Sequence, residues 1–251
     1  MDEKELTLER LRDLANQSFN NNKFTFSTFL SAGELSDFYS MEKELKFANP
    51  LVWGGAENTE RAMVRFGNPE VLGYTEDFPI AMLEVSPLSM KFSEDFSHRD
   101  FLGSLMNLGI ERNTLGDILI KDNRGYVFCR DSVSEYICEN LTRVKHTTVS
   151  VSVSDKALEV FKPVLEERII QAASERADSV VSKVYNLSRN TSNELFRAGK
   201  VFVNNRECTE NASLLKENDI LSVRGFGKLI FRGVAGMSKK GKLNLKVEIY
   251  R

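Results

Sequence analysis

Three basic residues within Asn186–Arg206, "NLSRNTSNELFRAGKVFVNNR", have the chemistry to hold an anion: Arg189, Arg197 and Lys200. Residues four apart share a helix face, so Arg189, Asn193 and Arg197 should line up along one side. A guanidinium donates two parallel hydrogen bonds to phosphate oxygens and also stacks on bases, while a lysine adds a mobile point charge. These residue types are not suited to covalent chemistry. The pattern therefore predicts phosphate binding, with ordinary solvated charge as the alternative for any single residue.

A second pattern, "RGYVFCRD" from Arg124, places Tyr126 and Phe128 two residues apart. On a strand both rings point from one face, where RNA-recognition (RRM) domains stack aromatic side chains on unpaired bases. Half of that motif is absent, because Val127 replaces a small residue and Asp131 replaces an aromatic one. Tyr126 and Phe128 are therefore candidates for base stacking, and the alternative is a hairpin whose two rings face a core.

A third pattern, His98-Arg99-Asp100, resembles the catalytic loop of protein kinases, but the required Asn is missing because position 105 is Leu. We expect Ser97 to begin a helix here, with Asp100 orienting its first turn. His98 and Arg99 remain candidates for a functional surface. The histidines and cysteines lack the spacing of metal ligands, and no glycine-rich phosphate loop is present, so we expect no metal and no cofactor.

The elements that must position these residues fall into three predicted regions of an α+β protein. Residues 1–75 form a small α/β region with a helix at 6–20, a second helix capped by Ser31, and short strands around Gly54 and Gly55. Residues 76–165 follow the order β-α-β-β-α-β, which is the RRM-like (ferredoxin-like) plait, with a helix capped by Ser132.

Residues 155–171 are interpreted as a connector, although a helix broken at Pro163 or an edge strand fits the pattern as well. Residues 172–251 are predicted to be an α-α-β domain. Ser174 should cap its first helix, and its second should run from Ser188 to Gly199 with Leu195 and Phe196 inward.

Charge is divided unevenly along the chain. Residues 179–251 hold 14 Lys or Arg against 6 Asp or Glu, whereas residues 1–178 hold 20 against 30. Such asymmetry suggests a nucleic-acid-binding module joined to something else. No apolar run approaches the roughly 18 residues of a membrane helix, and the first residues, "MDEKELTLER", are acidic, so we expect a cytoplasmic protein that makes no membrane contact.

The motifs Arg176-Ala-Asp178, Leu187-Ser-Arg189, Leu195–Asn204 and Asp219–Arg224 together resemble the S-four RNA-binding domain. Ala177 departs from that pattern, which usually has Leu, and so removes core volume. The resemblance and the basic turn near the end of the chain give the residues expected to bind RNA: Arg176, Ser188, Arg189, Asn193, Arg197, Lys200, Asn204, Arg224, Lys228, Lys239, Lys240 and Lys242.

Over nearly its whole length the chain resembles the YlmH family, through "GGAENTERAMVRFG", "HRDFLGSLMNLGIERNTLGDILI" and "SVRGFGKLIFRG". That resemblance implies a non-enzymatic, monomeric factor that binds large-subunit rRNA and tRNA on the bacterial ribosome in quality control. Two alternatives stay open: an RNA-modifying enzyme that carries an S-four domain, and a cell-division adaptor whose acidic N-terminal part binds protein.

Overall fold

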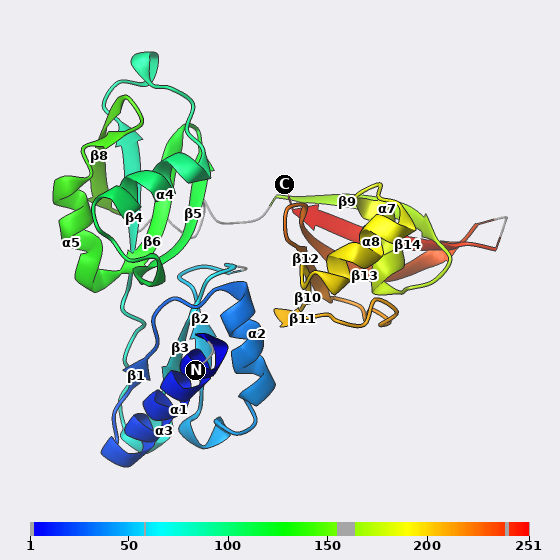
Figure 1. The fold of residues 1–251 in the computed structure, drawn as a ribbon, viewed down its shortest axis with the longest axis horizontal. Helices are drawn as coiled ribbons and strands as arrows, with labels where there is room; N and C mark the ends of the chain where they lie inside the picture. The colour runs from blue at the N-terminus through cyan, green and yellow to red at the C-terminus, as the bar shows by residue number, and fades with distance from the viewer. Residues whose placement is uncertain (1–2, 58, 155–163, 239–240, 251) are drawn as a thin grey trace. The chain divides into compact units, whose positions relative to one another are not determined.

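A computed structural model describes residues 3–57, 59–154, 164–238 and 241–250. The fold class is the predicted α+β, with seven α-helices and three antiparallel sheets among the described residues. The chain divides into two compact units, residues 1–162 and 163–251 (Figure 1). No helix of the described part has the length and apolar character needed to cross a membrane.

The first part of unit 1 combines two longer helices and the four-residue helix α3 with a small three-stranded sheet of order β1-β3-β2. Ser31 caps α2 in the predicted capping box, since its Oγ accepts from Glu34 N and its own N donates to the Glu34 carboxylate. The elements are α1 (Glu3–Asn21), β1 (Thr25–Phe26), α2 (Ala32–Met41), β2 (Leu51–Trp53), β3 (Met63–Phe66) and α3 (Pro69–Leu72), with a 3-10 helix at Lys46–Ala48.

The second part of unit 1 has the predicted order β-α-β-β-α-β with one short strand, β7, added before the last strand, and its sheet has five strands in the order β5-β6-β4-β8-β7. Its elements are β4 (Ile80–Pro87), α4 (His98–Asn107), β5 (Leu115–Lys121), β6 (Arg124–Arg130), α5 (Asp131–Asn140), β7 (Arg143–Val144) and β8 (Thr147–Val153), with 3-10 helices at Met90–Phe92 and Arg112–Thr114. Helix α5 begins at Asp131, so the predicted cap at Ser132 is wrong: the Ser132 amide donates to the Asp131 carboxylate inside the first turn.

Both faces of this five-stranded sheet are covered. Helices α4 and α5 lie on one face, where Phe101, Leu105 and Ile137 pack against Leu83, Val85 and Val127 (Figure 1). On the other face Met82, Tyr126 and Phe128 pack against Phe29, Ala56 and Met63, which come from the first 63 residues. The sheet therefore lies between two apolar cores of unit 1.

Unit 2 is a six-stranded antiparallel sheet of order β11-β10-β12-β13-β14-β9 with two helices on one face (Figure 1). Its elements are β9 (Leu165–Ala172), α7 (Ala177–Val184), α8 (Arg189–Arg197), β10 (Val201–Val203), β11 (Arg206–Glu207), β12 (Ile220–Val223), β13 (Gly227–Met237) and β14 (Leu243–Tyr250). Residues of both helices and of five strands share one core, which fixes the helices on the sheet.

Two sequence predictions about unit 2 are corrected. Residues 165–171 are no connector but most of the edge strand β9, which pairs with β14 from Leu165 opposite Tyr250 to Ala172 opposite Leu243. The connector residues 155–163 lie outside the described residues. Helix α7 begins at Ala177 with Arg176 in the cap position, so Ser174 does not cap it. Ala177 itself is fully buried in the core of unit 2.

Candidate nucleic-acid interface

The basic face of unit 2 is set by the way helix α8 begins, packs and ends. Ser188 caps it, since its Oγ accepts from the amide of Thr191 at 3.1 Å. Leu195 and Phe196 point into the core as predicted, with exposed fractions of 8% and 2%. Gly199 ends the helix with a φ of 61°, the left-handed conformation that glycine adopts without strain. This orientation leaves the opposite side of α8 to solvent.

Arg189 and Arg197 belong to α8 and Lys200 follows its end; these three residues are here called the α8 cations. All three are exposed. Within the described part of the chain, no carboxylate pairs with any of them, whereas Arg232 in the same unit is bound to Glu248 at 2.8 Å. Arg189 and Arg197 on α8, with Lys200 three residues beyond its end, give this side of unit 2 positive charges suited to an anionic partner.

A hollow of about 550 Å³ opens beside α8. Four of its lining residues are basic, and Asp178 is its one acidic side chain. The hollow is lined by Gln171, Ala173, Ser174, Arg176, Asp178, Ser179, Ser182, Lys183, Leu187, Arg189 and Lys242. The structure thus brings together Arg189 from α8, Arg176 before α7, and Lys242 before β14, which lie far apart in the sequence. Lys183 is exposed as well and was not predicted from the sequence.

Arg176 is held by its own carboxylate partner. Its Nε and Nη2 donate to the two oxygens of Asp178 at 3.0 and 2.8 Å, and Asp178 is only 3% exposed. The hydrogen bonds to Asp178 raise the pKa of Arg176. Because Ser192 Oγ donates to the Asp178 carbonyl at 2.9 Å, the same residue also joins α7 to α8. Arg176 therefore positions the helices. Only the guanidinium N–H groups that do not bind Asp178 remain available to another partner.

Other residues predicted to bind RNA are occupied by contacts within unit 2. Asn204 donates to Asp219 at 2.8 Å and accepts from the Ile220 amide at 2.9 Å. Asn193 accepts from Asn211 at 2.8 Å, and the Arg224 guanidinium lies 4.8 Å from the centre of the Phe202 ring. Lys228 is half-buried, and Ser188 serves as the cap. Lys239 and Lys240 lie outside the described residues, while Lys242 is exposed at the hollow.

Tyr126 and Phe128 are buried, with exposed fractions of 7% and 2%. Both lie in the core between the five-stranded sheet and the first 63 residues. Desolvation raises the pKa of the Tyr126 hydroxyl, which fits this position. No ring face is open to a base, so the prediction of base stacking is wrong and the alternative, a core hairpin, describes these residues.

His98 and Arg99 open helix α4, where the Ser97 amide and hydroxyl bind the Asp100 carboxylate at 2.7 and 2.6 Å. Asp100 thus orients the first turn, as predicted. Desolvation, and then Arg112, lower the pKa of His98, so its imidazole is neutral at pH 7. Arg99 is exposed. Of this pair, only Arg99 carries positive charge toward solvent.

The middle of the chain is similar in sequence to a known protein domain. Residues 74–158 match the family model described as "Putative RNA-binding domain in YlmH". The chain is also 26% identical over 199 residues to the ribosome-associated protein quality control protein P2 of Bacillus subtilis (strain 168), which covers 78% of this chain and 76% of the relative. The middle of this chain is thus similar to a domain found in YlmH proteins.

A solved structure, the cell division protein ylmH from Streptococcus pneumoniae, aligns with 62% of this chain and 93% of its own, at a TM-score of 0.49 and 15% identity. The matched segment 74–158 contains the sheet whose aromatic residues are buried. The burial of Tyr126 and Phe128 therefore leaves these two rings unavailable for base stacking in this segment.

Proposed function

We propose that this chain is a non-enzymatic RNA-binding factor of the bacterial ribosome, in which unit 2 is an S-four domain that holds phosphates of folded RNA. One observation carries the proposal: Arg189, Arg197 and Lys200 are exposed together without a carboxylate partner among the described residues. Phosphate contacts provide most of the affinity of such interfaces and orient the protein on the RNA.

The finer assignment is to large-subunit rRNA and tRNA in ribosome-associated quality control, in the cytoplasm. Support comes from the resemblance of the whole chain to YlmH proteins and from the name of the Bacillus subtilis relative, which places that protein in ribosome-associated quality control. The excess of Lys and Arg in residues 179–251 supports an RNA partner for unit 2.

Co-sedimentation with purified ribosomes tests the proposal. Arg189→Glu, Arg197→Glu and Lys200→Glu together should strongly weaken binding at moderate salt. Arg197→Glu alone should weaken binding and lower the slope of log affinity against log salt by about one, since one phosphate contact is lost.

Lys216→Glu is the matched control, because Lys216 is exposed in the same unit, outside the hollow, and undergoes the same change of charge. Ribosome binding equal to wild type in the triple variant, with folding verified by circular dichroism, would show that the α8 cations are not the interface. Equal losses in Lys216→Glu and Arg197→Glu would instead indicate a response to net charge alone.

A further inference from the structure

We infer that unit 1 carries a second RNA-backbone site, a hollow between helix α4, the end of α5 and strand β7, here called the α4 hollow. The inference rests on the proposed function, because RNA is its ligand. It assigns to the segment matched by the YlmH domain a surface other than the sheet face, whose candidate aromatic residues are buried.

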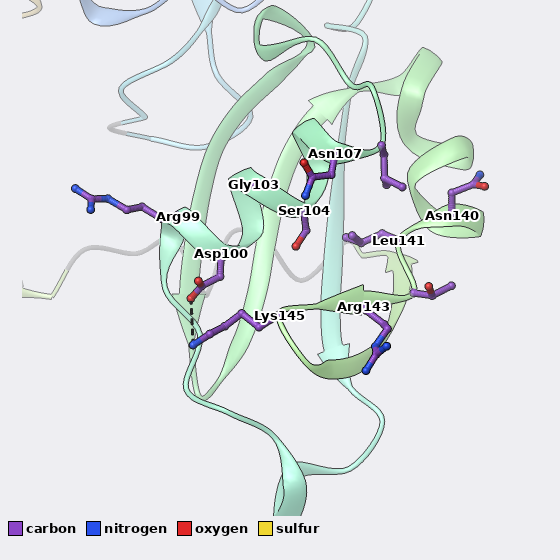
Figure 2. A pocket seen from close by; sticks show the side chains of 11 residues that line it. Arg99, Asp100, Gly103, Ser104, Asn107, Asn140, Leu141, Arg143 and Lys145 are labelled. Atoms are coloured by element: carbon purple, nitrogen blue, oxygen red, sulfur yellow. Dashed lines mark ion pairs between the residues drawn. The ribbon is translucent and has the colours of Figure 1, made fainter.

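The α4 hollow has a volume of about 480 Å³ and polar walls (Figure 2). Arg99 and Asp100 stand at the start of α4 and Asn107 at its end, while Arg143 lies in β7 and Lys145 in the turn after it. Figure 2 shows the Arg99 and Arg143 side chains extending from two different sides of the hollow, while Lys145 reaches toward Asp100. A nucleic-acid backbone that crosses the hollow would have a guanidinium at either side.

The α4 hollow is lined mainly by basic side chains, whereas the domain at residues 74–158 is acidic overall. Residues 74–158 contain 13 Asp or Glu and 9 Lys or Arg, so the domain as a whole repels RNA. Contact with RNA therefore requires a local basic surface. Three of the nine basic residues line this one hollow, with a single carboxylate, Asp100.

Most other arginines of the domain are used by the fold, and this distinguishes Arg99 and Arg143. Arg112 donates to the carbonyls of Leu115 and Gly116, and desolvation lowers its pKa to about 10. Arg124 is paired with Glu84 at 2.7 Å. By contrast, Arg99 has no polar partner in the described part of the chain, and Arg143 donates one long bond, 3.3 Å, to the His146 carbonyl.

Lys145 and Asp100 form the fixed side of the hollow. Lys145 Nζ lies 3.4 Å from a Glu94 oxygen and 3.8 Å from an Asp100 oxygen, and it donates to the Asp95 carbonyl at 3.2 Å. Asp100 is bound to Ser97 at the same time. These contacts hold the β7–β8 turn against the start of α4, so Lys145 is a positioning residue and Arg99 and Arg143 supply the free charge.

Gly103 keeps the hollow open. A glycine inside a helix costs about 1 kcal/mol relative to alanine, and Gly103 lies within α4. A Cβ added there would meet no atom within 4 Å, so packing against protein does not require glycine. The position lines the hollow, where a missing side chain lets a phosphate backbone approach the helix closely.

The test uses full-length protein and deproteinised large-subunit rRNA in filter binding across a range of KCl concentrations. Arg99→Glu with Arg143→Glu should weaken binding and lower the salt slope by about two, one for each lost phosphate contact. Gly103→Glu should weaken binding as well, because it places a carboxylate in the hollow. That change introduces a good helix former where space is free, so folding should be retained.

Two controls match these changes: Lys121→Glu, an exposed cation of the same domain outside the hollow, and Gly103→Ala, which adds a methyl group without charge. Lys121→Glu should bind as wild type, and Gly103→Ala should weaken binding less than Gly103→Glu, because it adds bulk without charge. Wild-type slopes in Gly103→Glu and in the Arg99→Glu/Arg143→Glu variant would overturn the α4 hollow. If the α8 variants still lose ribosome binding in that case, the proposed function stands and only this inference fails. If the α8 variants bind ribosomes normally while the hollow variants lose rRNA binding, the α4 hollow stands and the assignment of the α8 cations fails.

Discussion

At the scale of single residues, the contacts of each cation separate structural arginines from those available to RNA. Arg61, Arg112 and Arg176 donate to carbonyls or to a carboxylate within the fold. Arg189 and Arg197 carry the same group on an exposed helix face without such a partner in the described residues. The sequence motif contained both kinds, because residue type and spacing do not reveal whether a guanidinium is already bound.

Tyr185 gives a prediction about pH at this scale. Its Oη is buried without a hydrogen-bond partner among the described residues, and desolvation raises its pKa to about 12. The folded state thus favours the neutral phenol, so the contribution of Tyr185 to stability is complete below about pH 10 and is lost as pH rises toward 12. Tyr185→Phe should be neutral or stabilising by up to about 1 kcal/mol at pH 7 and should reduce the alkaline loss.

Urea unfolding of wild type and Tyr185→Phe between pH 8 and about 11 measures this difference. Tyr136→Phe is the control, since Tyr136 is exposed and lies in unit 1. If the free energy of unfolding of Tyr185→Phe at pH 7 falls by more than 1 kcal/mol, the Tyr185 hydroxyl has a hydrogen-bond partner and is not simply desolvated.

At the scale of elements, the sequence patterns correctly predicted those features that depend on residues close together in the chain. Helix α8 was located correctly, because its cap at Ser188, its inward Leu195 and Phe196 and its end at Gly199 are all local signals. Strand β9 was left as one alternative, since its partner β14 lies about 80 residues further along the chain. The burial of Tyr126 depends likewise on residues such as Phe29, about 100 positions away. An alternating pattern cannot say which distant segment covers a sheet face.

Arg61 joins the first 63 residues, which cover one face of the five-stranded sheet of unit 1, to that sheet. Its Nε donates to the Leu115 carbonyl and its Nη2 to the Phe29 carbonyl, both at 2.9 Å. The Asp117 carboxylate accepts from the amides of Glu60 and Arg61 at 2.6 and 3.0 Å. Arg61→Ala should therefore cost about 2 kcal/mol or more, because it removes charged hydrogen bonds and leaves carbonyls unsatisfied.

The same substitution should speed hydrogen exchange in β5 and β6 and expose Tyr126 and Phe128 to a hydrophobic dye. Arg12→Ala provides the comparison: Arg12 forms an exposed pair with Glu44 at 3.5 Å, so its loss should cost under about 0.5 kcal/mol. Equal stability of the two variants would mean that Arg61 does not fasten the first 63 residues to the sheet.

At the scale of the whole molecule, two basic surfaces occur on two compact units of one chain: the α8 cations on unit 2 and the α4 hollow on unit 1. Connection through one chain makes the second contact with a long RNA intramolecular, at an effective concentration that reaches the millimolar range for short linkers. Both surfaces then contribute to a single affinity. An RNA too short to contact both surfaces occupies one of them.

RNA length should therefore decide how the variants behave. On large-subunit rRNA, charge reversal of Arg189 and Arg197 or of Arg99 and Arg143 should each weaken the same binding event, and the combined variant should lose about four from the salt slope. On an oligonucleotide of about ten nucleotides, wild type should bind two molecules and each pair of reversals should remove one. Isothermal titration calorimetry measures that stoichiometry. A different result would contradict the second site: wild type binds one oligonucleotide per chain, the α8 reversals abolish that binding, and the hollow reversals leave it unchanged. Of the two surfaces, only the one on unit 2 would then bind RNA, because the hollow would contribute neither a site of its own nor affinity for the longer RNA.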